Sequence, residues 1–111
     1  AEGWKSSVAL AARDHLPAAP IEGPLSVSLR FYLPRPKAHY RGKEQTLRID
    51  SPTYHTAKPD ADNLAKAVLD ALTELGVWKD DAAVAVLRVT KFYSNGAPGC
   101  DIAIQSVEGE R

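Results

Sequence analysis

The sequence predicts a single small α+β domain, in which a mixed or antiparallel sheet of about three or four strands packs with two helices. Three observations predict this fold class: a period-2 alternation over residues 25–33, a helical apolar stripe over 60–75, and two further strand-like segments near the C-terminus. A chain of 111 residues can build one modest core but not two, so we expect one domain over residues 1–111.

The first half of the chain predicts one helix, one strand and one loop. Residues 4–16 carry an imperfect apolar stripe that stops at Pro17, which is typical of a helix. Leucine, valine and phenylalanine alternate with polar residues over 25–33, which indicates a half-buried strand that ends at Pro34. The polar and aperiodic stretch 35–58 is expected to be a long loop, which in small domains is usually functional or disordered.

The second half predicts one helix and two strands. Apolar residues recur on one face of residues 60–75, and Gly76 is placed to terminate this helix. The valine-rich residues 83–93 indicate a strand, and a turn with an Asn-Gly pair separates it from an alternating segment at 100–104. We therefore expect the last two strands to form a hairpin. Trp78 is expected to anchor the core.

Composition excludes several classes of protein. A hydrophobic content of 44% with 25% charged residues fits an ordinary globular domain, and no run approaches the ~18 apolar residues of a membrane helix. The first ten residues lack the layout of a secretory signal. The single cysteine, Cys100, excludes an internal disulfide and a cysteine-based zinc site, and we expect it to pack as a small apolar residue. A cytoplasmic setting is the default expectation.

Charged residues are unevenly distributed although they sum to zero. Residues 35–58 contain six basic residues against two acidic ones, a local charge of +4, whereas residues 59–81 contain six acidic residues against two lysines, a local charge of −4. A basic stretch can hold phosphates, but clustered acids repel them unless a cation lies between. The alternative is that both runs are solvated surfaces.

The acidic residues around the predicted second helix form a pattern that suits a hard cation. Asp60 follows Pro59 and is a good N-cap residue, and Asp62 falls in the first turn, where the two carboxylates can converge at the positive end of the helix dipole. Asp80 and Asp81 can complete the set if the chain returns to this helix end. Oxygen ligands alone favour Mg²⁺, with Mn²⁺ as a substitute.

A lysine extends this pattern along the helix. Lys66 lies four residues after Asp62 and four before Asp70, so the three residues form one stripe roughly opposite the apolar face. The alternative interpretation is a capped helix with an Asp–Lys–Asp ladder, in which each pair contributes only ~0.3–0.5 kcal/mol. An EF-hand is excluded, because Ala65 stands where that loop needs glycine and Ala71 stands at its last ligand position.

These residues lie in a segment that resembles the signature of the RusA family of Holliday-junction resolvases. The segment runs from Lys58 to Leu72 and continues through Gly76-Val77-Trp78 to Asp80-Asp81. In that family a D-x-D-N-x-x-K helix start is followed by D-A-L and then by a D-D pair before a strand that ends near a lysine. The resemblance is strong over residues 54–93, and a match of several parts at fixed spacings is more specific than a single D-x-D.

The resemblance implies a Mg²⁺-dependent crossover junction endodeoxyribonuclease that acts in DNA recombination and repair, in a bacterial cell or a phage-infected host. It implies that Asp60, Asp62 and Asp81 bind the metal and that Lys66 is the catalytic lysine. Asp80, the first member of the acidic pair, is expected to support the site or to bind a second metal ion.

The same resemblance implies a four-way DNA junction as substrate and a homodimer with one site per subunit, since a junction needs two symmetric nicks. Asn63 and Asp70 are expected to support the site by hydrogen bonds. His39 and His55 are expected to be solvated loop residues. Phosphate contacts are expected from basic residues of the loop and from one strand end, namely Arg35, Lys37, Arg41, Lys43, Arg48, Lys58 and Lys91.

One departure and two alternatives accompany this interpretation. Family members usually begin with a strand and a loop ahead of the region that corresponds to residues 1–4, so we expect that strand to be missing here. The first alternative is a nuclease of the same chemistry that cuts flaps or forks. The second is a DNA-binding module that retains the fold without catalysis.

Overall fold

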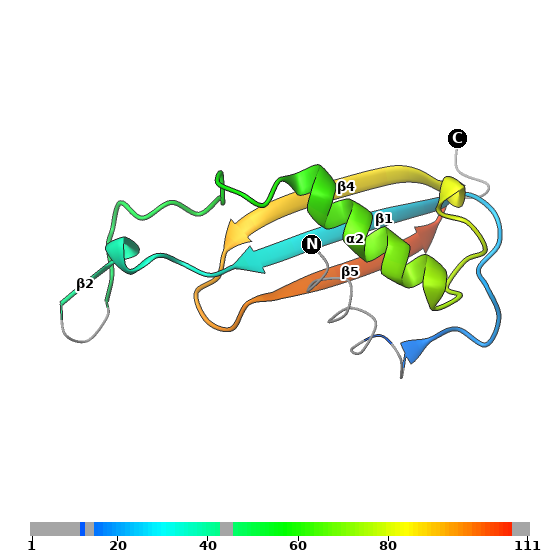
Figure 1. The fold of residues 1–111 in the computed structure, drawn as a ribbon, viewed down its shortest axis with the longest axis horizontal. Helices are drawn as coiled ribbons and strands as arrows, with labels where there is room; N and C mark the ends of the chain where they lie inside the picture. The colour runs from blue at the N-terminus through cyan, green and yellow to red at the C-terminus, as the bar shows by residue number, and fades with distance from the viewer. Residues whose placement is uncertain (1–11, 13–14, 43–45, 108–111) are drawn as a thin grey trace.

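The computed structural model describes residues 12, 15–42 and 46–107, and its centre is a three-stranded sheet with one long helix on one face (Figure 1). Strand β1 (Leu25–Leu33) lies in the middle, β4 (Val84–Tyr93) runs parallel to it on one side, and β5 (Gly99–Ser106) runs antiparallel on the other. Helix α2 (Ala61–Glu74) packs on one face of this sheet. The predicted α+β class is confirmed.

Strand β1 is central because one of its faces is wholly apolar. The inward side chains from Leu25 to Leu33 are buried, and they pack against buried residues of α2 such as Leu64 and Val68. Burial of each such side chain contributes roughly 1.5–3 kcal/mol. The predicted strand over residues 25–33 is confirmed with the same bounds.

Helix α2 begins and ends where the sequence indicates. Asp60 is the N-cap residue in extended conformation, and Gly76 follows the helix with a φ of 82° that favours glycine. The N–H of Gly76 donates to the carbonyl oxygen of Thr73 at 3.0 Å. Trp78 is buried, as expected, and its indole N–H donates to the Thr73 hydroxyl at 2.7 Å.

The predicted hairpin between the last two strands is wrong. β4 and β5 do not pair with each other, because β1 lies between them and pairs with both. The connection crosses the end of β1, where the N–H of Ser94 donates to the carbonyl oxygen of Leu33 at 2.7 Å. β1 pairs with β4 along one edge and with β5 along the other, so that apolar residues of all three strands contribute to one core face, whereas a two-stranded hairpin alone is marginally stable.

The described residues of the stretch 35–58 contain regular structure that the predicted loop did not include. Its first part, here called the arm (residues 35–42 and 46–52), contains a short 3-10 helix η2 (Lys37–His39) and a two-stranded ribbon of β2 (Tyr40–Arg41) and β3 (Thr46–Leu47), and it projects beyond the sheet (Figure 1). The remainder returns along the outer edge of β4, where Tyr54 forms a bridge with Phe92.

Parts of the predicted structure lie outside the described residues. These are almost all of the helix expected over residues 4–16, and Lys43 among the expected phosphate contacts. Within the described part of the chain, no helix is long and apolar enough to cross a membrane.

Candidate active site

The start of α2 is held against the end of β4 by Lys91. Its Nζ donates to the carbonyl oxygens of Ala57 at 2.7 Å and Pro59 at 2.8 Å. Lys91 pairs in register with buried Phe31 and therefore lies on the sheet face that α2 covers, where an ammonium group requires polar partners. The two carbonyl groups satisfy this requirement and fix the backbone immediately before Asp60.

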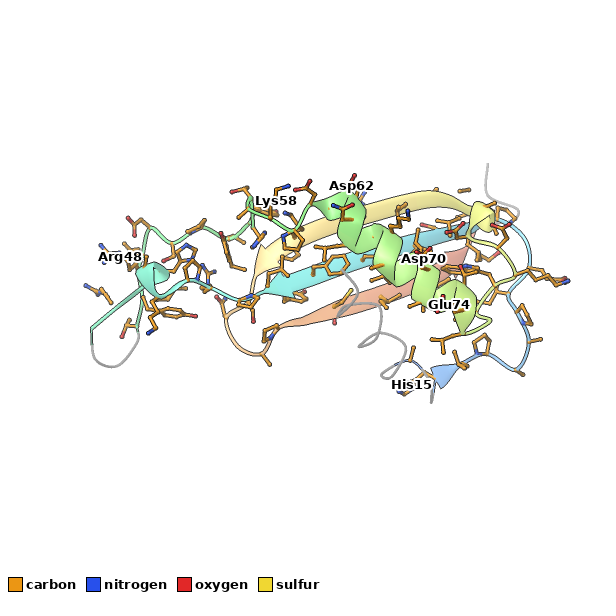
Figure 2. The ribbon with its side chains drawn as sticks, viewed as in Figure 1. His15, Arg48, Lys58, Asp62, Asp70 and Glu74 are labelled. Carbon is orange, nitrogen blue, oxygen red and sulfur yellow. The ribbon has the colours of Figure 1, made fainter. Side chains whose placement is uncertain are left out.

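Asp60 and Asp62 occupy the positions that the sequence predicts, at the N-cap and in the first turn of α2. The Asp60 carboxylate makes no capping hydrogen bond, and its ion pair with Lys58 is long, at 3.7 Å, and exposed to solvent. The Asp62 Oδ1 accepts from the N–H of Asn63 at 3.0 Å, and the side chain is exposed at the start of the helix (Figure 2). Both carboxylates therefore retain oxygen atoms that are open to solvent.

Lys66 lies one turn further along the exposed side of α2. Within the described part of the chain it forms no ion pair with Asp62 or Asp70, so the alternative of an Asp–Lys–Asp ladder is not realised. Asp70 is half-buried, and Figure 2 shows it two turns beyond Asp62 on the helix. The exposed ammonium group of Lys66 lies on the same helix as the exposed carboxylates of Asp60 and Asp62, where it can offset charge on a phosphate that a cation holds there.

Asp80 and Asp81 lie in a second short element, the 3-10 helix η3 (Asp81–Ala83), directly before β4. Asp80 is its N-cap residue, and its Oδ1 accepts from the N–H of Ala82 at 2.8 Å. Asp81 follows in the first turn and is half-buried. Asp80 therefore fixes the turn that presents Asp81.

Within one copy of the chain, Asp81 lies far from the start of α2. Asp60 lies beside Lys91, whereas Asp81 precedes Val84 at the opposite end of β4. Lys91 lies seven positions after Val84 in the strand, which corresponds to about 23 Å. Figure 1 shows η3 in yellow at one end of the sheet and the start of α2 well removed from it. The described residues accordingly contain no cluster of three or more acidic, histidine or cysteine side chains that could hold a metal ion.

The two loop histidines are packed side chains, which corrects the expectation that they are solvated. His55 is 8% exposed, and its ring centroid lies 4.8 Å from that of Tyr93. Its Nδ1 is buried without a hydrogen-bond partner, and burial together with the charge of Lys91 lowers its pKa below 6.5. His39 meets the same ring edge-on, with the centroids 4.7 Å apart.

The expected phosphate contacts fall into two groups. Arg35 and Lys91 are occupied by the protein itself; Arg35 donates to Pro52 O at 2.7 Å and to Asn95 Oδ1 at 3.0 Å and lies over the Tyr93 ring. These contacts tie the base of the arm to the sheet. The other described members are exposed, namely Lys37, Arg41, Arg48 and Lys58. A sequence signal for the positioning role of Lys91 exists, since it lies two positions after Val89, a partly buried residue of the same strand that packs against the core.

A cavity of about 320 Å³ also lies in the arm, lined by Arg41, Arg48, Ile49 and Asp50. Arg48 and Asp50 form a long ion pair of 3.7 Å across it, and Ile49 is fully exposed. Two arginines and one aspartate leave a positive charge at this surface, which favours contact with an anionic backbone.

Comparison of the sequence with known proteins places this chain in a family. The family model described as Endodeoxyribonuclease RusA matches residues 1–105. The uncharacterized protein YqaN of Bacillus subtilis (strain 168) is 39% identical over 105 residues, which cover 94% of this chain and 72% of YqaN. The crossover junction endodeoxyribonucleases RusA of Escherichia coli (strain K12) and of Enterobacteria phage 82 are 47% identical over 45 residues, 40% of this chain and 38% of each enzyme. The chain therefore belongs to the RusA family of endodeoxyribonucleases, which are hydrolases that act on DNA.

Proposed function

We propose that this protein resolves four-way DNA junctions as a homodimer, by paired hydrolysis of phosphodiester bonds at two metal-dependent sites. The observation that carries the proposal is the start of α2, where Asp60, Asp62 and Lys66 stand together, exposed, on a helix end that Lys91 holds in place. Relatives that match 45 residues of this chain carry the name crossover junction endodeoxyribonuclease, which supports the choice of substrate.

The residues present fit a hard divalent cation in their chemistry. Asp60 and Asp62 offer carboxylate oxygens without competing cationic partners at short distance, and oxygen donors favour Mg²⁺ or Mn²⁺. Mg²⁺ bound there would supply Lewis-acid stabilisation of the phosphate and activation of a water molecule. A third carboxylate is needed to complete the predicted metal ligands. Asp81 of the same copy lies too far from Asp60 and Asp62 to provide it.

A second copy of the chain can supply that third carboxylate through the edge of β4. The segment 53–55 covers this edge at one end only, through His55 N–H to Lys91 O at 3.0 Å and Tyr93 N–H to Thr53 O at 2.9 Å. No described strand covers the edge from residue 84 to residue 90. Val86 and Leu87, which are 50% and 44% exposed, lie in this free edge, whereas β5 exposes no large hydrophobic residue.

The symmetry of this edge brings the carboxylates together. A two-fold axis near Leu87, the midpoint of residues 84–90, would pair the two β4 edges in antiparallel orientation. Asp81 of one copy then lies beside Lys91 of the other, and hence beside the other copy's Asp60 and Asp62. Two equivalent sites result, which suits two symmetric nicks in a junction.

Each side chain then has a defined task. Asp60, Asp62 and the second copy's Asp81 hold the cation, while Asp80 orients Asp81 by capping η3. The Lys66 ammonium offsets charge on the scissile phosphate. The exposed basic residues of the arm bind backbone phosphates, which makes DNA binding strongly dependent on salt.

Mixing of two inactive variants tests this arrangement. Asp62→Asn and Asp81→Asn are each expected to abolish junction cleavage while binding is retained. After exchange of subunits between them, each heterodimer has one site with intact Asp60, Asp62 and Asp81, so nicking of one strand returns. Asp62→Asn mixed with Lys66→Ala is the matched control, since both changes lie on α2 and every site stays defective.

Four outcomes would contradict the proposal. Unchanged cleavage by either single aspartate variant would remove these residues from the site. No recovery in the mixture would place all ligands in one copy and reject pairing through β4. Equal cleavage of junction, flap and linear duplex would reject selectivity for four-way junctions, and failure to bind Mg²⁺ or Mn²⁺ would favour a non-catalytic DNA-binding module.

A further inference from the structure

Three aromatic rings form a row on the sheet face opposite α2. This aromatic row consists of Tyr54, Phe92 and Tyr32, with ring centroids 5.3 Å and 5.5 Å apart and interplanar angles of 27° and 17°. Tyr32 alternates with the buried residues of β1 and so lies on the opposite face of the sheet, which no described helix covers and which is here called the open face. Tyr54 is 60% exposed.

The two ends of the row leave ring faces accessible. Tyr54 terminates it on the outer edge of β4, and at the other end the residue opposite Tyr32 on β5 is Gly99. A Cβ atom placed on Gly99 would meet no atom within 4 Å, so the space beside Tyr32 is open. A planar ring of the size of a nucleobase can stack there on the outer face of Tyr32.

The surroundings indicate the chemistry of the ligand. Arg30 and Arg88 are exposed on the same face, and Asp101 stands opposite Arg30. Two arginines against one aspartate attract an anionic strand only weakly, so stacking must provide most of the affinity. A ligand that offers flat aromatic rings on an anionic backbone fits both features, and a base-paired duplex does not, because its bases are covered by their own stack.

The row also lies close to the candidate active site. Phe92 follows Lys91 directly, and Lys91 faces α2 while Phe92 faces the opposite side. The start of α2 and the aromatic row thus occupy the two faces of β4 at the same end. A DNA strand at Asp60 and Asp62 needs only to pass around the end of β4 to reach the row.

We propose that the open face of the sheet is a binding site for unpaired DNA, in which nucleobases stack on the aromatic row and phosphates meet Arg30 and Arg88. The proposal extends the proposed function, since a branch point that the enzyme opens supplies such bases next to the scissile phosphate. Its test is binding without metal, so it can fail or succeed independently of cleavage.

The experiment compares two fluorescent oligonucleotides of about twelve residues, oligothymidylate and an abasic strand of the same length, by anisotropy in EDTA at low salt. The wild-type chain is expected to bind oligothymidylate about tenfold more tightly than the abasic strand. Gly99→Val fills the open space without a strained φ and should lower the oligothymidylate affinity by about tenfold. Ala103→Val, an exposed position on the same face, should change neither affinity.

A second variant keeps the test decisive if Gly99→Val unfolds. Tyr54→Leu removes the exposed ring at the other end and is expected to weaken oligothymidylate binding with the abasic affinity unchanged. Loss in either variant supports the site and identifies the end on which the base stacks. Equal affinity of the wild-type chain for the two strands, or wild-type affinity in both variants, would overturn the proposal.

Discussion

The side-chain ammonium group of Lys91 donates a 2.8 Å hydrogen bond to the carbonyl oxygen of Pro59. This bond joins the C-terminal end of β4 to the residue that precedes the N-cap of α2, across 32 positions of sequence. It determines where Asp60 stands relative to the sheet, and therefore which end of β4 carries the candidate active site.

Replacement of Lys91 by methionine should destabilise the fold and move the start of α2. Loss of charge-assisted hydrogen bonds to two carbonyl groups is expected to lower the free energy of unfolding by about 1–3 kcal/mol, and junction cleavage should fall with it. Urea unfolding and cleavage assays measure the two effects. Lys79→Met is the control at an exposed lysine. Unchanged stability with weakened DNA binding would instead make Lys91 a phosphate contact.

Replacement of Lys66 by alanine should separate catalysis from folding. The side chain is exposed and has no ion pair within the described part of the chain, so the free energy of unfolding should change by less than about 0.5 kcal/mol. Cleavage is expected to fall by roughly 10²–10³-fold because charge on the phosphate is no longer offset. Single-turnover cleavage and gel-shift binding measure the two effects, with Lys79→Ala as the control. A cleavage rate equal to that of the wild-type chain would remove Lys66 from the site.

A charge on the free edge of β4 should prevent dimer formation. Leu87 is 44% exposed, so Leu87→Asp costs little in the isolated copy, but two buried carboxylates at a two-fold axis repel each other. We expect a monomer by analytical ultracentrifugation, with loss of cleavage. Ala103→Asp places the same charge on β5 and should leave the dimer intact; the reverse pattern would assign the interface to β5.

Stability should decrease in mildly acidic solution because of His55. Burial and Lys91 hold its pKa below 6.5 in the folded state, so the unfolded chain binds a proton more readily. The contribution of neutral His55 to the free energy of unfolding is fully present above pH 6.5. It is lost as the pH falls through the lowered pKa of the folded state. Urea unfolding between pH 5 and 8 measures the slope. His55→Phe should flatten it, and an equal slope in that variant would assign the effect to another group.

The exposed arginines of the arm should set the salt dependence of binding. Arg41→Ala and Arg48→Ala are each expected to reduce the slope of log affinity against log salt by about 1, with no change in the cleavage rate of bound junction. Fluorescence anisotropy over a salt series measures the slope. A slope equal to that of the wild-type chain would show that the arm does not contact phosphates.

Local patterns in the sequence determined the elements near the candidate site. The alternation over residues 25–33 predicted β1, and the apolar stripe with Asp60 and Gly76 predicted α2 to within one residue at each end. These features depend on neighbours three or four positions apart, so propensity, capping and periodicity suffice to specify them. The D-x-D-N-x-x-K segment in the same helix also indicated the family.

Only the tertiary structure decided how these elements meet. The sequence suggested a hairpin of the last two strands, but insertion of β1 between them depends on which apolar faces bury each other, a non-local choice. The same choice puts Asp81 and Asp60 at opposite ends of β4, although their spacing in the chain suggested that they converge. Spacing fixes which side of a helix a residue occupies, whereas the distance between two elements is set by packing. This distance is the reason why we propose that a second copy completes the carboxylate set.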